Sequence, residues 1–181
     1  NITNKIILLM DIGDDCMFSQ DIWLRTSDAH PIYSVKTKER LNYPKDILIG
    51  DHIWSGQEVM ILKGAIVGSG SVLGARAILT NKPYFSNCSY AGAPARMISE
   101  EGAIFFEKTD LNAANKEKSA KYTKYESDEF IYEYSKDECI IYDVLDFIKQ
   151  NKDPNARIEY FKAISKAKNR FALSSKALEN K

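Results

Sequence analysis

Two histidines, His30 and His52, are the side chains in this chain best suited to move a proton near neutral pH. The ordinary pKa of an imidazole is about 6.5, so a histidine can take the proton of a hydroxyl group that attacks an activated carbonyl. Such a base needs a partner on its second ring nitrogen, and for His30 this is either Asp28 or a main-chain carbonyl. A lone loop histidine equally fits a surface position without a task, so the elements around it decide its meaning.

The composition of the 181-residue chain is typical of a globular protein and excludes some partners. The 25 basic and 25 acidic residues balance, and no apolar run is long enough to cross a bilayer, so we expect neither nucleic acid nor a membrane as a partner. The cysteines Cys16, Cys88 and Cys139 are odd in number and lack paired metal-ligand spacing. This favours a reducing compartment and predicts a cytoplasmic protein.

A six-residue period organises the middle of the sequence. One column of this period is aliphatic at all but one position, and it consists of Ile49, Ser55, Ile61, Val67, Leu73 and Leu79. The following position is mostly glycine, at Gly50, Gly56, Gly68 and Gly74. The column four residues on is small or β-branched, and it consists of Ile53, Val59, Ala65, Ser71 and Ala77. Neither an α-helix nor an ordinary strand repeats every six residues, so the columns predict short strands and corners stacked into a parallel β-helix.

The same period appears nearer the start of the chain, at Ile6, Ile12, Phe18 and Leu24. Between the two runs the register slips, and residues 31–46 are polar, bounded by prolines and without a period. We therefore expect a β-helix domain over residues 1–98, with an inserted loop at 31–46 that leaves the coil.

The remaining residues, 99–181, predict an α-helical C-terminal extension, because glycine almost disappears and apolar residues recur at helical spacing. One helix is indicated by Ile140, Ile141, Val144, Leu145 and Ile148. A second is indicated by Asp153 as N-cap and Pro154 in the first turn, followed by an apolar stripe of Ile158, Phe161, Ile164 and Ala167. Residues 110–128 fit either an exposed helix or a connector. We expect the extension to pack on the β-helix.

Hexapeptide-repeat acetyltransferases, such as the galactoside and maltose O-acetyltransferases, have closing coils that resemble the segment IGDHIWSGQEVMILKGAIVGSGSVLGARAILTNKPYFSNCSYAGAPARMI. The branch that acts on capsular polysaccharide and sialic acid is more similar, because of TSDAHPIY and RLNYPKDILIGDHIW. The resemblance covers residues 6–98 and implies a left-handed parallel β-helix. It also implies an O-acetyltransferase that uses acetyl-coenzyme A and no metal on a hydroxyl of a sugar or polysaccharide, as a homotrimer with active sites between subunits.

The resemblance implies that His30 is the general base, because it precedes Trp54 by the four hexapeptides found in the family. Trp54 would shape the pocket for the acyl group and the acceptor. Main-chain N–H groups near Ser55–Gln57 would stabilise the oxyanion during a direct transfer, with Gly56 allowing the ligand to come close. At His52 the family often has Asn or His, which indicates corner geometry or subunit packing rather than catalysis.

The donor-binding residues implied by the resemblance are Gly56, Gln57, Ala75, Thr80, Lys82, Ala93 and Arg96. The small residues suit a pantetheine arm that runs along the main chain. Arg96 fits either a phosphate contact or a solvated charge at the end of the fold. Asn81–Lys82 departs from the family's threonine–lysine pair, which leaves the contacts to the adenine end open. Tyr33, Lys36 and Arg40, directly after His30, are expected to recognise the acceptor.

Three other functions fit parts of the same pattern. A γ-type carbonic anhydrase shares the prism but needs three histidines for zinc, and the chain has two. An N-acyltransferase acting on a nucleotide amino sugar shares the fold and the donor, and a non-catalytic β-helix assembly module shares the fold alone. Thioester turnover with different acceptors separates these alternatives.

Overall fold

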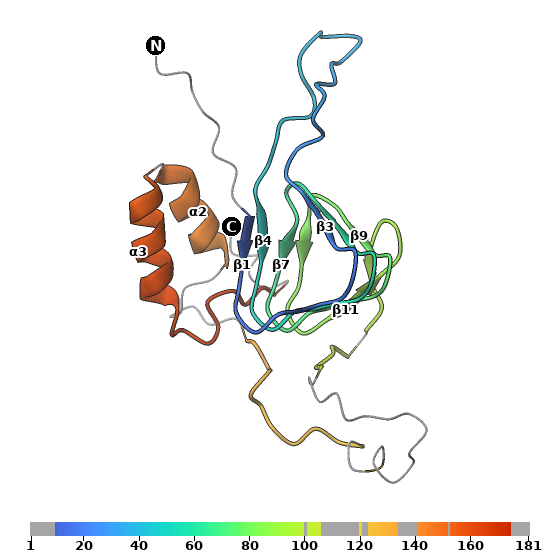
Figure 1. Ribbon diagram of the computed structural model, residues 1–181, viewed down its shortest axis with the longest axis vertical. Coiled ribbons are helices and arrows are strands. Elements are labelled where there is room, and N and C mark those ends of the chain that lie inside the picture. Colours follow the sequence, from blue (N-terminus) through green and yellow to red (C-terminus); the bar gives the residue numbers. More distant parts are fainter. Residues whose placement is uncertain are drawn as a thin grey trace.

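The computed structural model describes residues 10–99, 101–105, 120, 123–133, 141–151 and 153–174. Its strands are β1 (Met10–Ile12), β2 (Met17–Phe18), β3 (Trp23–Arg25), β4 (Ile47–Ile49), β5 (Trp54–Ser55), β6 (Met60–Leu62), β7 (Ile66–Val67), β8 (Val72–Leu73), β9 (Ile78–Leu79), β10 (Pro83–Tyr84), β11 (Ser89–Ala91) and β12 (Arg96–Met97). Its helices are α2 (Ile141–Gln150) and α3 (Pro154–Ile164). Figure 1 shows a stack of coils with the two helices beside it and a loop that projects from it.

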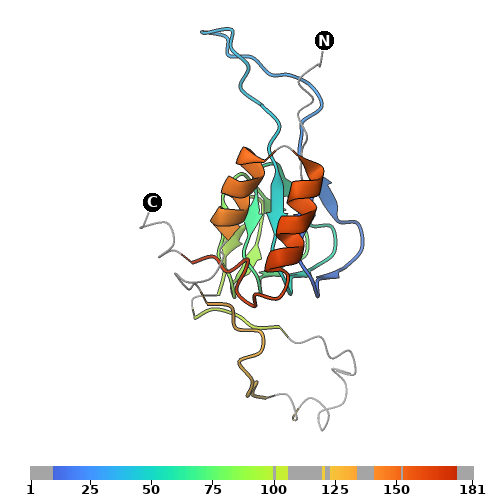
Figure 2. The same ribbon diagram turned by 90° about the vertical axis from the view of Figure 1, so that its left-hand side faces the viewer.

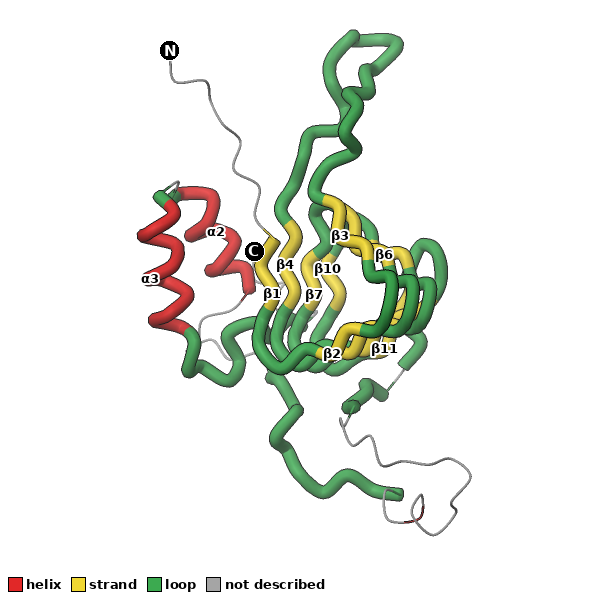
Figure 3. The backbone as a smooth tube through the Cα atoms, viewed as in Figure 1, coloured by secondary structure: helices red, strands yellow, loops and turns green. Residues whose placement is uncertain are grey.

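The coils stack so that each contributes one strand to each of three flat faces. Face A consists of β1-β4-β7-β10, face B of β2-β5-β8-β11 with β12 at its edge, and face C of β3-β6-β9. All neighbouring strands are parallel except β11 and β12, which are antiparallel. The predicted left-handed parallel β-helix is confirmed, and Figure 3 shows its three-sided cross-section.

The inside of the prism is built from the two columns of the six-residue period. Every member of the Ile49 to Leu79 column is at most 1% exposed, and every member of the Ile53 to Ala77 column is fully buried. The polar Ser55 is tolerated inside because its hydroxyl donates to the carbonyl of Gly56 at 3.4 Å. Stacked coils thus bury a continuous apolar core, as repeat proteins do.

The last coil departs from the period. Tyr84 follows Leu79 after five residues instead of six, and it pairs with Val67. Tyr84 and Tyr90 fill the interior at this end, with their rings edge to face at 5.0 Å. β12 then folds back on β11, so the parallel ladder of face B ends there.

Face A is covered by the C-terminal extension. Leu48 points outward from β4 and is 1% exposed, because it lies in a second apolar cluster with Ile141, Val144 and Ile148 of α2. Phe171 and Leu173 complete this cluster. Figure 2 shows both helices in front of this face. The expectation that the extension packs on the β-helix is confirmed for the described residues.

The segment after α3 ties the extension to successive coils. Arg170 donates to both carboxylate oxygens of Asp51, at 2.9 and 2.6 Å, and to Asp14 at 2.7 Å. The main-chain N–H of Ser69 donates to the carbonyl of Phe171 at 3.1 Å, and that of Ser86 to the carbonyl of Leu173 at 2.8 Å. We call residues 169–174 the strap.

The extension follows the sequence prediction at the start of α3 and along the apolar face of α2, and departs from it in part of the stripe predicted for α3. Asp153 accepts a hydrogen bond from the N–H of Asn155 as the N-cap of α3, with Pro154 in the first turn, as predicted. Ile158 is 51% exposed, so this member of the predicted stripe is not buried, and Ala167 lies beyond the end of α3. Ile140 and most of 110–128 lie outside the described residues. No described helix has the length and apolar character needed to cross a bilayer.

Candidate active site

The loop between β3 and β4, residues 26–46, carries His30 away from the prism (Figure 1). The two limbs of the loop run antiparallel and are joined by a bridge between Tyr33 and Arg40. The N–H of Leu41 also donates to the carbonyl of Ile32, at 2.8 Å. His30 is exposed where the loop leaves the edge between faces C and A. This is an open position from which a base can reach a second molecule.

Asp28 contacts the main chain of His30 and not its ring. The N–H of His30 donates to the carbonyl of Asp28 at 2.7 Å, whereas the Asp28 carboxylate accepts from Lys63 and, at 2.8 Å, from Asn42. The hydrogen bonds from Lys63 and then Asn42 lower the pKa of Asp28 below its ordinary value. Asp28 is therefore an anion whose contacts with Lys63 and Asn42 hold the start of the loop in place.

Trp54 lies on a different face from His30. Its side chain points outward from face B, in register with Met17 and Val72, and is 42% exposed. The ring of Phe105, from the C-terminal extension, packs on it with centroids 5.9 Å apart. Figure 3 shows β2 and β11, two other strands of this face, on the side of the prism away from the loop. The two groups predicted to form one site are therefore separated within a single chain.

The residues expected to bind the donor divide between two edges that flank face C. Gly56, Gln57 and Ala75 lie at the corner between faces B and C, and Ala93 continues this corner in the last coil. Thr80 and Lys82 lie at the other corner, between faces C and A, where the loop also leaves. Arg96 is exposed on β12, at the edge of face B.

Several of these residues already have partners within the chain. The N–H of Gly56 donates to the carbonyl of Leu73 at 2.7 Å, so it is not free to stabilise an oxyanion. A Cβ at Gly56 would lie 2.7 Å from the main-chain nitrogen of Ala75, so coil stacking by itself requires glycine. Lys82 donates to the carbonyl of Ala95 at 3.0 Å.

Face C between these edges is not covered by other described residues. Its outward side chains include Trp23, which is 55% exposed, and the half-buried Met60 and Ile78 in register with it. An apolar strip of this kind is typical of a surface that another protein covers. The strip separates the loop edge from the edge that carries Gly56 and Ala75.

His52 packs in a corner, as expected. It is 1% exposed, and its ring is stacked between Phe105 and Phe130 at centroid distances of 4.0 and 3.7 Å. Its Nδ1 lies 2.6 Å from a carboxylate oxygen of Asp15 and its Nε2 lies 3.1 Å from the carbonyl of Phe105. No pattern in the sequence points to Phe105, whose ring packs on both His52 and Trp54, or to the roles of Lys63 and Asn42.

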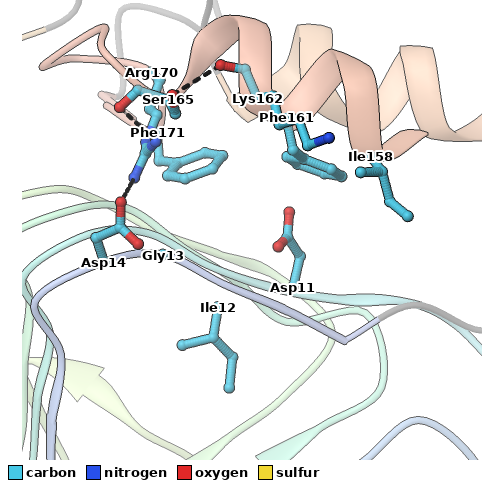
Figure 4. A pocket seen from close by; sticks show the side chains of 10 residues that line it. All are labelled: Asp11, Ile12, Gly13, Asp14, Ile158, Phe161, Lys162, Ser165, Arg170 and Phe171. Carbon is cyan, nitrogen blue, oxygen red and sulfur yellow. Dashed lines mark hydrogen bonds and ion pairs between the residues drawn. The ribbon is translucent and has the colours of Figure 1, made fainter. Parts of the chain in front are cut away.

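A cavity of about 390 Å³ lies between α3 and the first described coil (Figure 4). Its walls include Asp11, Phe161, Arg170 and Phe171, and none of the predicted site residues lines it. The cavity is therefore separate from the predicted active site. Within the described part of the chain, no group of three or more His, Cys, Asp or Glu side chains is placed to hold a metal ion.

The comparisons with known proteins place the β-helix among acetyltransferases. No protein-family model matches the chain. A polysialic acid O-acetyltransferase of Escherichia coli O1:K1 / APEC is 46% identical over 99 residues, which is 55% of this chain and 31% of that protein. A polysialic acid O-acetyltransferase of Neisseria meningitidis is 49% identical over 55 residues, 30% of this chain and 26% of that protein. The chain thus spans less than half the length of these curated relatives.

Two solved structures of polysialic acid acetyltransferases are also similar to this chain. The polySia-specific acetyltransferase NeuO aligns with a TM-score of 0.52 and 42% identity, covering 62% of this chain and 52% of that one. The polysialic acid O-acetyltransferase OatWY aligns with a TM-score of 0.51 and 33% identity, covering 62% and 54%. Over its β-helix the chain is therefore similar to the hexapeptide-repeat acetyltransferases, near their capsular O-acetyltransferase branch.

Proposed function

We propose that this chain is an O-acetyltransferase that moves an acetyl group from acetyl-coenzyme A to a hydroxyl of a sugar or polysaccharide of the capsule or cell surface. His30 is the general base in this proposal. The observation that carries it is the exposed histidine on a braced loop beside the apolar face C, in a β-helix that is 46% identical to a polysialic acid O-acetyltransferase over 99 residues. The free thiols of Cys16 and Cys88 support a cytoplasmic location.

The proposed reaction is a direct transfer. The acceptor oxygen attacks the thioester carbonyl while His30 takes its proton, the new C–O bond forms, the C–S bond breaks, and the proton passes to the departing sulfur. The N–H of Gln57 is the main-chain donor proposed for the oxyanion. Acetyl-coenzyme A supplies the activated acyl group when it binds, and Gly56, Ala75, Thr80, Lys82, Ala93 and Arg96 are the residues proposed to hold it.

We propose that the active site forms between two subunits of a homotrimer. His30 and Thr80 lie at one edge of face C, and Gln57 and Ala75 lie at the other, so they meet only if the loop edge of one copy faces the far edge of another. Covering the strip at Trp23 would also remove apolar surface from water. Face A is not available for this contact, because the extension already covers it.

The loop supports an acidic glycan as the acceptor. Lys36, Lys38 and Arg40 give its outer part a positive charge next to His30, and Tyr33 is 57% exposed. A polyanionic chain of sugars is attracted by such a group of charges, and an exposed aromatic ring suits sugar faces. Polysialic acid, named for the relatives, has this chemistry.

The test is release of free thiol from acetyl-coenzyme A in the presence of polysialic acid, a galactoside or a nucleotide amino sugar. We expect turnover with polysialic acid and a loss of about 100- to 10,000-fold in His30→Ala. Thr37→Ala is the control, because Thr37 is exposed at the tip of the same loop and its hydroxyl accepts only a weak bond from the N–H of Glu39 at 3.3 Å.

Two outcomes contradict the proposal. Turnover with the nucleotide amino sugar alone would identify an N-acyltransferase. Absence of thiol release with every acceptor would identify an assembly module with the same fold.

A further inference from the structure

Asn42 is a buried amide in a loop that is otherwise mostly exposed. It lies in the returning limb of the β3–β4 loop and is 9% exposed. Its Nδ2 donates to the carbonyl of His30 at 2.8 Å and to the carboxylate of Asp28 at 2.8 Å. Its Oδ1 accepts from the N–H of Ile32 at 2.6 Å. One side chain therefore binds the main chain at His30 and Ile32 and the side chain of Asp28.

The amide is connected to the rigid prism through an ion pair. Asp28, which binds Asn42, also pairs with Lys63, and Lys63 lies in the turn directly after β6 of the second described coil. The Lys63 side chain is 19% exposed, so this pair is partly shielded from water. A chain of contacts thus runs from the prism through Lys63, Asp28 and Asn42 to the main chain of His30.

The chemistry of the three partners requires an amide at position 42. The carboxylate of Asp28 and the carbonyl of His30 can only accept, and the N–H of Ile32 can only donate. An asparagine supplies two donors and one acceptor in this arrangement. An aspartate has the same shape but supplies no donor when ionised, and it would repel Asp28.

We propose that Asn42 is a positioning residue for His30, acting together with Asp28 and Lys63, and that it sets where the imidazole meets the acceptor. This inference rests on the proposed function above. Nothing among the described residues binds the imidazole itself, so its position depends on the main chain at residues 28–32. An error of about 1 Å in such a group costs on the order of 100-fold in rate.

The test is Asn42→Asp, with Asn155→Asp as the matched control. Asn155 is exposed in the first turn of α3, far along the chain from the loop, and receives the same change of charge. In Asn42→Asp we expect kcat to fall by about 10- to 100-fold, while KM for acetyl-coenzyme A stays within about twofold. Lys63→Gln should lower kcat in the same direction, and the double variant should fall by less than the product of the two effects, because both act through Asp28.

A second measurement does not depend on activity. Hydrogen exchange at the amide of Ile32 should become faster in Asn42→Ala and stay unchanged in Asn155→Ala, because Asn42→Ala removes the oxygen that accepts from that N–H.

The outcomes are distinguishable. Faster exchange with an unchanged kcat would overturn the positioning role and leave the proposed function intact. Unchanged exchange would show that Asn42 does not hold the loop, which also overturns the inference. A wild-type chain that transfers no acetyl group would contradict the proposed function, and with it the catalytic part of the inference. The exchange result would still show whether Asn42 holds the main chain of the loop.

Discussion

Asp11 shows how the covered face A alters a single carboxyl group. It lies on β1 and points toward α3 into the cavity drawn in Figure 4. Burial raises its pKa from 3.8 to about 6, and the negative charge of Asp51 adds to this effect, while the nearby Arg170 opposes it. Its Oδ2 is buried without a hydrogen-bond partner among the described residues. Asp11 is therefore more costly to ionise in the folded chain than in the unfolded chain.

We predict that Asp11→Asn stabilises the protein, and does so more strongly as the pH rises. Between pH values of about 4 and 6 the folded chain holds a proton on Asp11 that the unfolded chain has lost, so the stability of the wild type falls across this window relative to the variant. Above it the difference should be on the order of 1 kcal/mol, allowing for partial exposure of the carboxyl.

Denaturant unfolding of both proteins at pH values of about 4, 5, 6 and 7 measures this difference in stability, because these values span the interval in which Asp11 titrates. If the difference in unfolding free energy between the two proteins is the same at every pH, then the pKa of Asp11 is not raised by burial. Asp46→Asn in the same series controls for the loss of a carboxylate elsewhere.

Arg170 connects the strap to the β-helix, and its loss should act on the whole extension. Its guanidinium side chain is 8% exposed and neutralises Asp51, whose side chain is 11% exposed. Removing one partner of a buried pair leaves an uncompensated charge, which typically costs about 3–5 kcal/mol. We predict that Arg170→Ala destabilises the protein by an amount near the lower end of this range, because Asp14, the other partner, is largely exposed.

The strap should then detach before the prism unfolds. Hydrogen exchange at the amides of Ser69 and Ser86, which donate to carbonyls of the strap, should become faster in Arg170→Ala. Lys166→Ala removes an exposed cation between α3 and the strap and should leave both amides unchanged. Equal protection in the two variants would mean that the apolar contacts of Phe171 and Leu173 hold the strap without the ion pair.

The sequence predicts the coils well because each inward position repeats the environment of the one before it. Ile61 and Val67 could be assigned to the interior from spacing alone, since stacking places equivalent positions on top of one another. The N-cap at Asp153 was predictable because capping is local. The covering of face A was not, because it depends on contacts such as Arg170 with Asp51, which are 119 residues apart.

The candidate site was also predictable only in part from the sequence. The position of His30 in a loop after a strand follows from the pattern, but the three contacts of Asn42 do not, since a buried asparagine in a polar loop looks like any other loop residue. Phe105 is a similar case, because its packing on Trp54 depends on how the extension returns to face B.

At the scale of the whole molecule, face A of the prism is covered by the chain's own extension, whereas none of the residues that the structure describes covers face C. Face C carries Trp23, Met60 and Ile78 in one outward row. If this row is the seam of the proposed homotrimer, then Trp23→Glu should separate the subunits, because a carboxylate placed in an apolar seam loses its hydration.

Sedimentation of the 20.5 kDa chain measures the result. We expect the wild type to sediment as three copies and Trp23→Glu as one, with acetyl transfer lost in the separated chains because each site draws residues from two copies. Ile158→Glu is the matched control: Ile158 is 51% exposed against 55% for Trp23, but it lies on α3, beside face A and not on face C. The control should remain a trimer. If Ile158→Glu dissociates the assembly and Trp23→Glu does not, then the extension forms the seam, and the active site cannot be assembled from the two edges of face C.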